Sequence, residues 1–140
     1  MSGVFHTVTV ELTTGTVAAA RDITGECEVF LREFGARDGL LNVFVPHATA
    51  GVAILETGAG SEDDLLAAID ELLPRDDRWR HSHGSPGHGR DHVLPGFIAP
   101  HATVPVVSGK AALGTWQSIV LIDTNVDNPR RQVRLTFVGA

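Results

Sequence analysis

The chain has very little cysteine, since Cys27 is the only one among its 140 residues. An intrachain disulfide is therefore excluded, and so is a zinc site built from several thiolates. Apolar residues at helical spacing surround Cys27, which predicts a small core residue rather than a nucleophile. Long apolar runs are also missing, because no stretch approaches the roughly 20 residues that a membrane-spanning helix needs.

Basic residues are outnumbered. Eleven Lys and Arg stand against seventeen Asp and Glu, so the net charge is −6 with neutral histidines. Proteins that bind nucleic acid usually present a basic face to the phosphates, so we expect no nucleic-acid partner. Residues 1–12 alternate apolar and polar side chains and lack the basic and apolar regions of a secretory signal. We therefore expect a cytoplasmic protein with no membrane partner.

Histidine, in contrast, is frequent. Four of the seven histidines fall between His81 and His92. Residues 75–91 form a polar stretch rich in glycine, proline and histidine, which predicts a loop. Its length of about 17 residues favours a functional role over a plain connection.

The apolar pattern predicts an α+β fold. Helical spacing covers residues 23–34, ended by Gly35, and residues 61–73, capped by Ser61 and stopped by Pro74. Alternation or short apolar runs predict strands at 4–12, 40–45, 52–55, 103–107, 114–122 and 132–138. Turn-length connections and the lack of a linker or repeat predict a single compact domain over residues 1–140. We expect a mainly antiparallel sheet with two main helices.

Several side chains that could do chemistry stand at the ends of these elements. His47 follows a strand, Glu56 ends the next strand, and Asp64 opens the second helix. His81 and His92 bracket the long loop. Neutral imidazoles bind Zn²⁺ or another first-row metal, with carboxylates as ligands or supports, and they also transfer protons near neutral pH. The alternative is a set of solvated loop histidines, since residues 81–83 (His-Ser-His) have no specific metal spacing.

A second group could contact a substrate. Trp116 is placed on a strand, where tryptophan more often packs in the core, and Gln117 could reach a ligand or a histidine nitrogen. Arg130 and Arg131 could hold a phosphate bidentately, although a solvated surface pair explains them equally well. Nucleotide-binding glycine loops and the nucleophile elbow of serine hydrolases are absent from the sequence, which counts against those chemistries.

The segment 41–50, LNVFVPHATA, resembles the strand and His-Thr-Thr/Ser-Ala signature of the YjbQ-like proteins, also called the secondary thiamine-phosphate synthase family. Further matches follow in order along nearly the whole chain: Glu56, Asp64-Leu65, Pro74, Trp79-Arg80-His81, His92, Pro105-Val106 with Gly109, residues 113–117 (LGTWQ) and Arg130-Arg131.

The resemblance implies a compact α+β fold assembled as a homotrimer, with a polar pocket near the subunit boundaries. It also implies a thiamine-phosphate synthase activity, in which hydroxymethylpyrimidine diphosphate condenses with a thiazole phosphate and pyrophosphate is released. We therefore expect a small phosphorylated molecule as partner and zinc as the metal. The expected catalytic residues are His47, Glu56, Asp64 and His92; the metal ligands are His47, His81 and His92; and the substrate contacts are Trp116, Gln117, Arg130 and Arg131.

The chain departs from the family pattern at three places. Leu55 and Thr57 replace two asparagines beside Glu56, and the segment from Glu56 to Asp64 is one residue shorter, with residues 58–60 in place of an Asp-Pro. Residues 93–96 replace the start of a helix after His92. Two other functions therefore stay open. One is a metal-dependent hydrolase of a small phosphorylated or carbonyl compound, and the other is a non-catalytic trimer that binds a metal or an anion. The sequence also leaves open which of His81, His83 and His88 enters the pocket.

Overall fold

Two antiparallel sheets form the framework of the protein, whose structure is a computed structural model that describes residues 2–140. The large sheet contains, in spatial order, β1 (Val4–Thr13), β8 (Arg130–Gly139), β3 (Gly39–Phe44), β5 (His101–Val107) and β6 (Lys110–Ala111). The small sheet contains β2 (Ala19–Asp22), β7 (Ser118–Asp123) and β4 (Ala50–Leu55). These pairings confirm the predicted α+β fold with a mainly antiparallel sheet.

Two α-helices accompany the sheets, α1 (Thr24–Glu33) and α2 (Ser61–Leu72), together with two short 3₁₀ helices, η1 (His88–His92) and η2 (Leu94–Gly96). The predicted stop of α1 is confirmed, because Gly35 takes a left-handed φ of 61°, a conformation that glycine adopts without strain. The prediction that Ser61 caps α2 is wrong. Gly60 holds the cap position, and the Glu62 carboxylate accepts the free N–H groups of Gly58 and Gly60.

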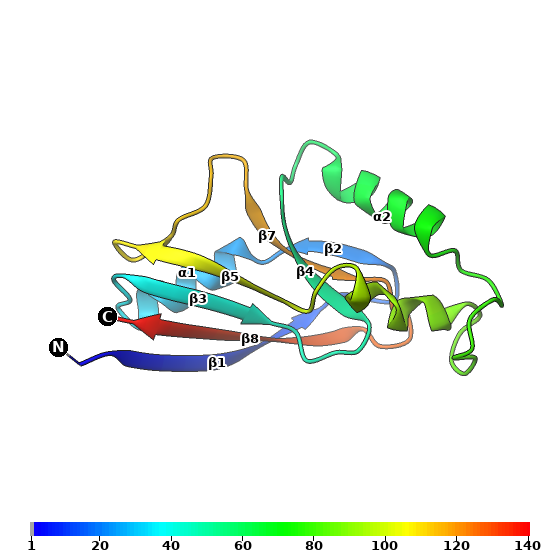
Figure 1. The fold of residues 1–140 in the computed structure, drawn as a ribbon, viewed down its shortest axis with the longest axis horizontal. Helices are drawn as coiled ribbons and strands as arrows, with labels where there is room; N and C mark the ends of the chain where they lie inside the picture. Colours follow the sequence, from blue (N-terminus) through cyan, green and yellow to red (C-terminus); the bar gives the residue numbers. More distant parts are fainter. Residues whose placement is uncertain (1) are drawn as a thin grey trace.

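Successive residues of β7 face two different cores. Ile119 and Leu121 pack in the larger core, between the small sheet with α1 on one side and the large sheet on the other. Val120 and Ile122 face the opposite way and are covered by α2 and η2. Figure 1 shows this order, with α2 outermost beyond β4 and β7. The central strand β7 is buried on both faces, as its continuous apolar run predicts. Cys27 is fully buried in the larger core, which confirms its prediction as a core residue.

Several elements differ from the sequence prediction. The strand predicted at 114–122 begins only at Ser118, and the segment between β6 and β7 arches away from the sheets (Figure 1). The strands β2 and β6 were not predicted, and η1 and η2 lie where a loop and a disturbed helix were expected. These four elements are too short to show a clear apolar period. Within residues 2–140, no helix is long and apolar enough to cross a membrane.

Candidate functional site

Three histidines converge at the end of the molecule opposite the two chain termini. His81, His88 and His92 each offer one ring nitrogen, and these nitrogens lie within 4.8 Å of one another. The Nε2 atoms of His88 and His92 are 3.0 Å apart, and the rings of His81 and His92 stack with centroids 4.0 Å apart. Figure 1 shows the segment from α2 to β5, which carries all three, folded back at this end.

Glycines allow this segment to fold so closely. A Cβ atom on Gly87 would lie 2.3 Å from Cγ of Arg75, and one on Gly89 would lie 2.4 Å from the carbonyl oxygen of His81. Gly87 also has a left-handed φ of 76°. Only glycine therefore lets η1 approach the preceding stretch closely enough to place His88 and His92 beside His81. The stretch itself is anchored by the indole N–H of Trp79, which donates to the Pro74 carbonyl at 2.9 Å.

Asp91 fixes the orientation of the His88 ring. Its carboxylate is fully buried, and it accepts from Nδ1 of His88 (3.0 Å), from Nη2 of Arg75 (3.1 Å) and from the hydroxyl of Thr124 (2.6 Å). Because Nδ1 donates to the carboxylate, the Nε2 atom of His88 carries the lone pair, which accepts a hydrogen bond from Nε2 of His92 when no metal is bound. A carboxylate behind a histidine in this way fixes the ring for metal binding in many zinc proteins.

The electrostatics favour the metal-binding form of His92. Burial lowers the pKa of His92 below its usual range, and the neighbouring His81 and His88 lower it further. His92 is therefore neutral at neutral pH, the form that binds metals. Nδ1 of His81 is buried without a hydrogen-bond partner. Tetrahedral Zn²⁺ sets its nitrogens about 3.3 Å apart, given Zn–N bonds of about 2.0–2.1 Å. The ring nitrogens of His88 and His92, 3.0 Å apart, are close to this spacing, and the third lies within 4.8 Å of both, so rotation of the rings would bring the three to one ion.

His47 lies apart from this group. The strand β3 ends where Phe44 pairs with Arg134, so the backbone N–H of Gln132 has no partner from β3. Nε2 of His47 accepts that N–H at 2.8 Å. Burial, and next the charge of Arg131, lower the pKa of His47 below its usual range. The ring therefore serves as a neutral acceptor at the end of a strand, and its Nε2 lone pair is already used.

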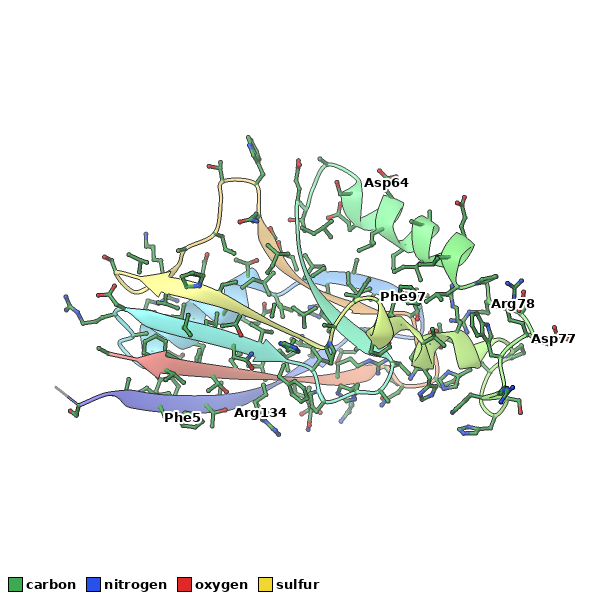
Figure 2. All side chains as sticks on the ribbon, viewed as in Figure 1. Phe5, Asp64, Asp77, Arg78, Phe97 and Arg134 are labelled. Atoms are coloured by element: carbon green, nitrogen blue, oxygen red, sulfur yellow. The ribbon has the colours of Figure 1, made fainter. Side chains whose placement is uncertain are left out.

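Glu56 and Asp64 are also separate from the three histidines. Both are exposed, and within residues 2–140 neither side chain makes a hydrogen bond or an ion pair. Asp64 stands at the start of α2, whose 12 residues span about 18 Å, whereas the histidine segment follows its other end. Figure 2 shows the separation between Asp64 and Asp77, which belongs to that segment. The structure does not bring these two carboxylates to the histidines.

The two arginines point in opposite directions, as neighbours on a strand must. Arg131 is 1% exposed and forms an ion pair with the buried carboxylate of Asp123. The Arg130 side chain is 77% exposed and lies 3.9 Å from the Glu11 carboxylate. The paired geometry that a bidentate phosphate clamp needs is therefore absent.

Trp116 and Gln117 lie in the arching segment before β7 rather than on a strand. The Trp116 side chain is 73% exposed, so it is not a core residue. The Gln117 side chain accepts the backbone N–H of Gly114 at 2.8 Å and closes its own loop. Their roles as substrate contacts stay predictions, and neither residue touches the histidines in a single copy of the chain.

Two of the three predicted metal ligands, His81 and His92, thus come together, and His88 completes the group. His83 is exposed. Its ring centroid is 4.0 Å from that of His81, but its nitrogens do not join those of the three grouped histidines.

Sequence reasoning missed Asp91, Arg75 and Thr124. The spacing of His88, Asp91 and His92, at i, i+3 and i+4, is the signal that one helical turn could present them together.

Known proteins with similar sequences cover most of the chain. A sequence model for the family described as "UPF0047 protein YjbQ-like" matches residues 8–140. A UPF0047 protein from Mycobacterium bovis is 71% identical over 101 residues, which are 72% of this chain and 78% of the relative. The UPF0047 protein YugU from Bacillus subtilis is 34% identical over 112 residues, or 78% of this chain and 80% of the relative.

Solved structures agree with the fold. A hypothetical protein from Aeropyrum pernix superposes with a TM-score of 0.87 at 32% identity, covering 96% of this chain and 99% of that chain. A protein from Sulfolobus solfataricus described as YbjQ-like superposes with a TM-score of 0.92, covering 99% of this chain and 100% of that chain. Its identity is 24%, so it supports the fold alone.

Proposed function

Because the chain belongs to the YjbQ-like UPF0047 family, and because three of its histidines converge at one site, we propose that it is a metal-dependent enzyme acting on a small phosphorylated molecule. The leading reaction is a condensation of the thiamine-phosphate synthase type, which the family resemblance suggests. The observation that carries the proposal is the convergence of His81, His88 and His92. Three imidazoles leave one side of a zinc ion open, which is typical of catalytic rather than structural zinc.

The chain's own residues have defined tasks in this proposal. A bound divalent ion supplies positive charge that stabilises a departing diphosphate. Asp91 keeps the His88 ring oriented with its lone pair outward, and the lowered pKa of His92 favours its neutral form. The close packing of Gly89 in η1 against Trp79 and the His81 carbonyl holds η1 beside the segment that carries His81. Binding and orientation are therefore prepared before a substrate arrives.

A metal-dependent hydrolase is the second candidate. Three neutral histidines without a carboxylate ligand are the set that gives zinc-bound water a pKa near 7 in carbonic anhydrase, and the same arrangement would support hydrolysis of a phosphorylated or carbonyl compound. The two reactions have different products. Condensation releases pyrophosphate only when both the pyrimidine diphosphate and the thiazole phosphate are present, whereas hydrolysis proceeds with one substrate and water.

The first test is the metal content of the untagged protein by elemental mass spectrometry, followed by both product assays. We expect about one zinc per chain in the wild type and in His47→Ala, the matched control outside the group. His88→Ala and His92→Ala should lose the zinc and any turnover with it. No zinc in the wild type, even after reconstitution, would contradict the proposal. Zinc without turnover in either assay would favour the non-catalytic binding protein.

We further propose that copies of the chain assemble through the outer face of the large sheet, as the homotrimer implied by the family resemblance. An apolar row crosses four neighbouring strands on this face, since Phe5 pairs with Val138, Val138 with Leu40, and Leu40 with Pro105. Phe5, Leu40 and Val138 are 67%, 51% and 50% exposed. A contiguous apolar surface of this kind is typical of a protein interface.

Leu40→Lys should therefore convert the assembly to monomers in sedimentation analysis, because it places a charge in the centre of the row. Leu72→Lys is the matched control, since Leu72 is 58% exposed on α2, away from the large sheet, and it should leave the mass unchanged. A monomeric wild type at micromolar concentration would contradict the assembly.

A further inference from the structure

We propose that a cavity beside the histidine group binds the phosphate group of the substrate, with Arg75 and Ser85 as the hydrogen-bond donors. The cavity has a volume of about 290 Å³, at the lower end of the range of ligand pockets. Its lining includes Arg75, Trp79, His81, Ser85, Pro86 and His88. His81 and His88 belong to both the cavity and the proposed metal site, so a ligand here contacts both. This inference rests on the proposed function and names the part of the chain that would recognise its substrate.

Unpaired polar atoms gather at this cavity. Within residues 2–140, four buried side-chain nitrogen or oxygen atoms have no hydrogen-bond partner, and three of them belong to residues that line it: Nη1 of Arg75, Nδ1 of His81 and Oγ of Ser85. A buried polar atom without a partner costs about 1–3 kcal/mol, and such atoms are rare in folded proteins. A metal on the histidines accounts for His81. The atoms of Arg75 and Ser85 are both donors, so they fit a ligand that carries acceptors.

The charge balance favours an oxyanion as that ligand. Arg75 already neutralises the buried carboxylate of Asp91 through Nη2 and keeps Nη1 free. Three neutral imidazoles bring no negative charge to a zinc ion, and Asp127, 3.4 Å from Nδ1 of His88, would balance only one of its two positive charges. A phosphate oxygen beside the ion, with Nη1 of Arg75 and the Ser85 hydroxyl donating to it, satisfies the ion and both donors.

The acidic side chains around the cavity are accounted for in different ways. The Asp76 carboxylate accepts hydrogen bonds from the guanidinium of Arg78, with nitrogen–oxygen distances of 2.7–3.0 Å. Asp77 is exposed at the outer tip, beside Arg78 (Figure 2). Asp127 accepts the backbone N–H of Ser85 at 3.1 Å, the main reason that its pKa lies below the usual range. The Ser85 hydroxyl lies close enough to this carboxylate to lower its pKa further as a donor, but it is not aligned for a full hydrogen bond, so it can turn either to Asp127 or to a ligand.

A larger cavity of about 680 Å³ lies between the end of α1 and the turn after β5, lined by residues such as Arg32, Arg37 and Lys110. None of the three histidines lines it. All three of its cations are exposed, and none of the four unpaired buried atoms belongs to it. Volume alone does not indicate a site, whereas donors without partners do.

The test is calorimetric titration of the zinc-loaded protein with inorganic phosphate, with zinc content measured on each sample. Ser85→Ala should weaken phosphate binding about tenfold, the size expected for one hydrogen bond to a charged group, while zinc content stays unchanged. Ser82→Ala is the matched control, because Ser82 lines the same cavity but is exposed, and it should bind phosphate as the wild type does. Arg75→Lys, which keeps the charge but loses the forked donor, should also weaken binding.

Phosphate binding that Ser85→Ala leaves unchanged, at normal zinc content, would overturn the inference without touching the proposed metal site. Acetate binding tighter than phosphate would overturn the phosphate assignment. If the wild type holds no zinc, the proposed function fails, and the same phosphate titration of the metal-free protein tests the cavity. Weak phosphate binding that is sensitive to Ser85→Ala would then support the cavity as an anion site, and no phosphate binding would overturn it.

Discussion

Replacing Asp91 by Asn should weaken zinc binding by about 10- to 100-fold, the usual effect of removing a carboxylate that orients a histidine ligand. The asparagine side chain can accept through one atom only, whereas the carboxylate accepts from His88, Arg75 and Thr124. At least one of these donors then faces an N–H₂ group. The guanidinium groups of Arg75 and Arg90 also lose the buried negative charge that they face. We therefore expect the free energy of unfolding of the zinc-free protein to fall by about 3–5 kcal/mol.

Competition with a chromophoric chelator measures the zinc affinity, and urea unfolding of the zinc-free protein measures the stability. Asp70→Asn is the control, because Asp70 also pairs with Arg90 but its side chain is 65% exposed. Arg90 itself is 4% exposed but also faces Asp91, which stays in place in this variant. Asp70→Asn should therefore keep its zinc affinity and lose less stability than Asp91→Asn. Equal behaviour of the two variants would show that Asp91 does not organise the site.

Much of the fold could be predicted from the sequence, because its strands and helices follow simple apolar periods. Alternation along β1 and β8 predicts two half-buried strands, and they pair with each other along their whole length. The face of α1 that carries Cys27, Phe30 and Leu31 recurs at helical spacing and is buried as predicted. Burial of apolar side chains decides these elements, so composition and spacing are sufficient to find them.

The site was predicted only in part, for a physical reason. His81 and His92 were found by their residue type, but His88 could not be separated from His83 in a loop without periodicity. The choice depends on the glycine-dependent packing of η1 and on Asp91, whose partners Arg75 and Thr124 are 16 and 33 residues away in the chain. Such contacts are set by tertiary structure, and no local pattern reports them.

The prediction for Arg130 and Arg131 failed for a different reason. As a sequence motif the two arginines were expected to act together on a phosphate. In the structure Arg131 faces inward from β8 and joins Asp123 at the end of β7, so that the pair connects the large sheet to the small one. Asp123 also accepts from the hydroxyl of Thr49 at 3.1 Å and from the backbone N–H of Asn125 at 2.9 Å. Alternation along a strand, which is visible in the sequence, already separates the two side chains.

Arg131→Met should therefore destabilise the protein strongly, while Arg130→Met should not. Asp123 is only 1% exposed, so removing Arg131 leaves a buried carboxylate without its cation. Removing one partner of a buried ion pair costs about 3–5 kcal/mol. At this chain length each kcal/mol lowers the melting temperature by about 2–8 °C, so calorimetry should show a decrease of roughly 10–20 °C. Arg130 is exposed and its pairing with Glu11 is distant, so Arg130→Met should change stability by less than about 0.5 kcal/mol.

The double variant Arg131→Met Asp123→Leu separates the lost charge balance from lost packing. Replacing both members of a buried pair by apolar side chains is often close to neutral, so much of the stability should return. Thr49 and the Asn125 N–H then lack their acceptor, which limits the recovery. A double variant as unstable as Arg131→Met alone would mean that the stability came from the packing of the Arg131 side chain and its backbone contacts. In that case the ion pair would not be what joins the two sheets.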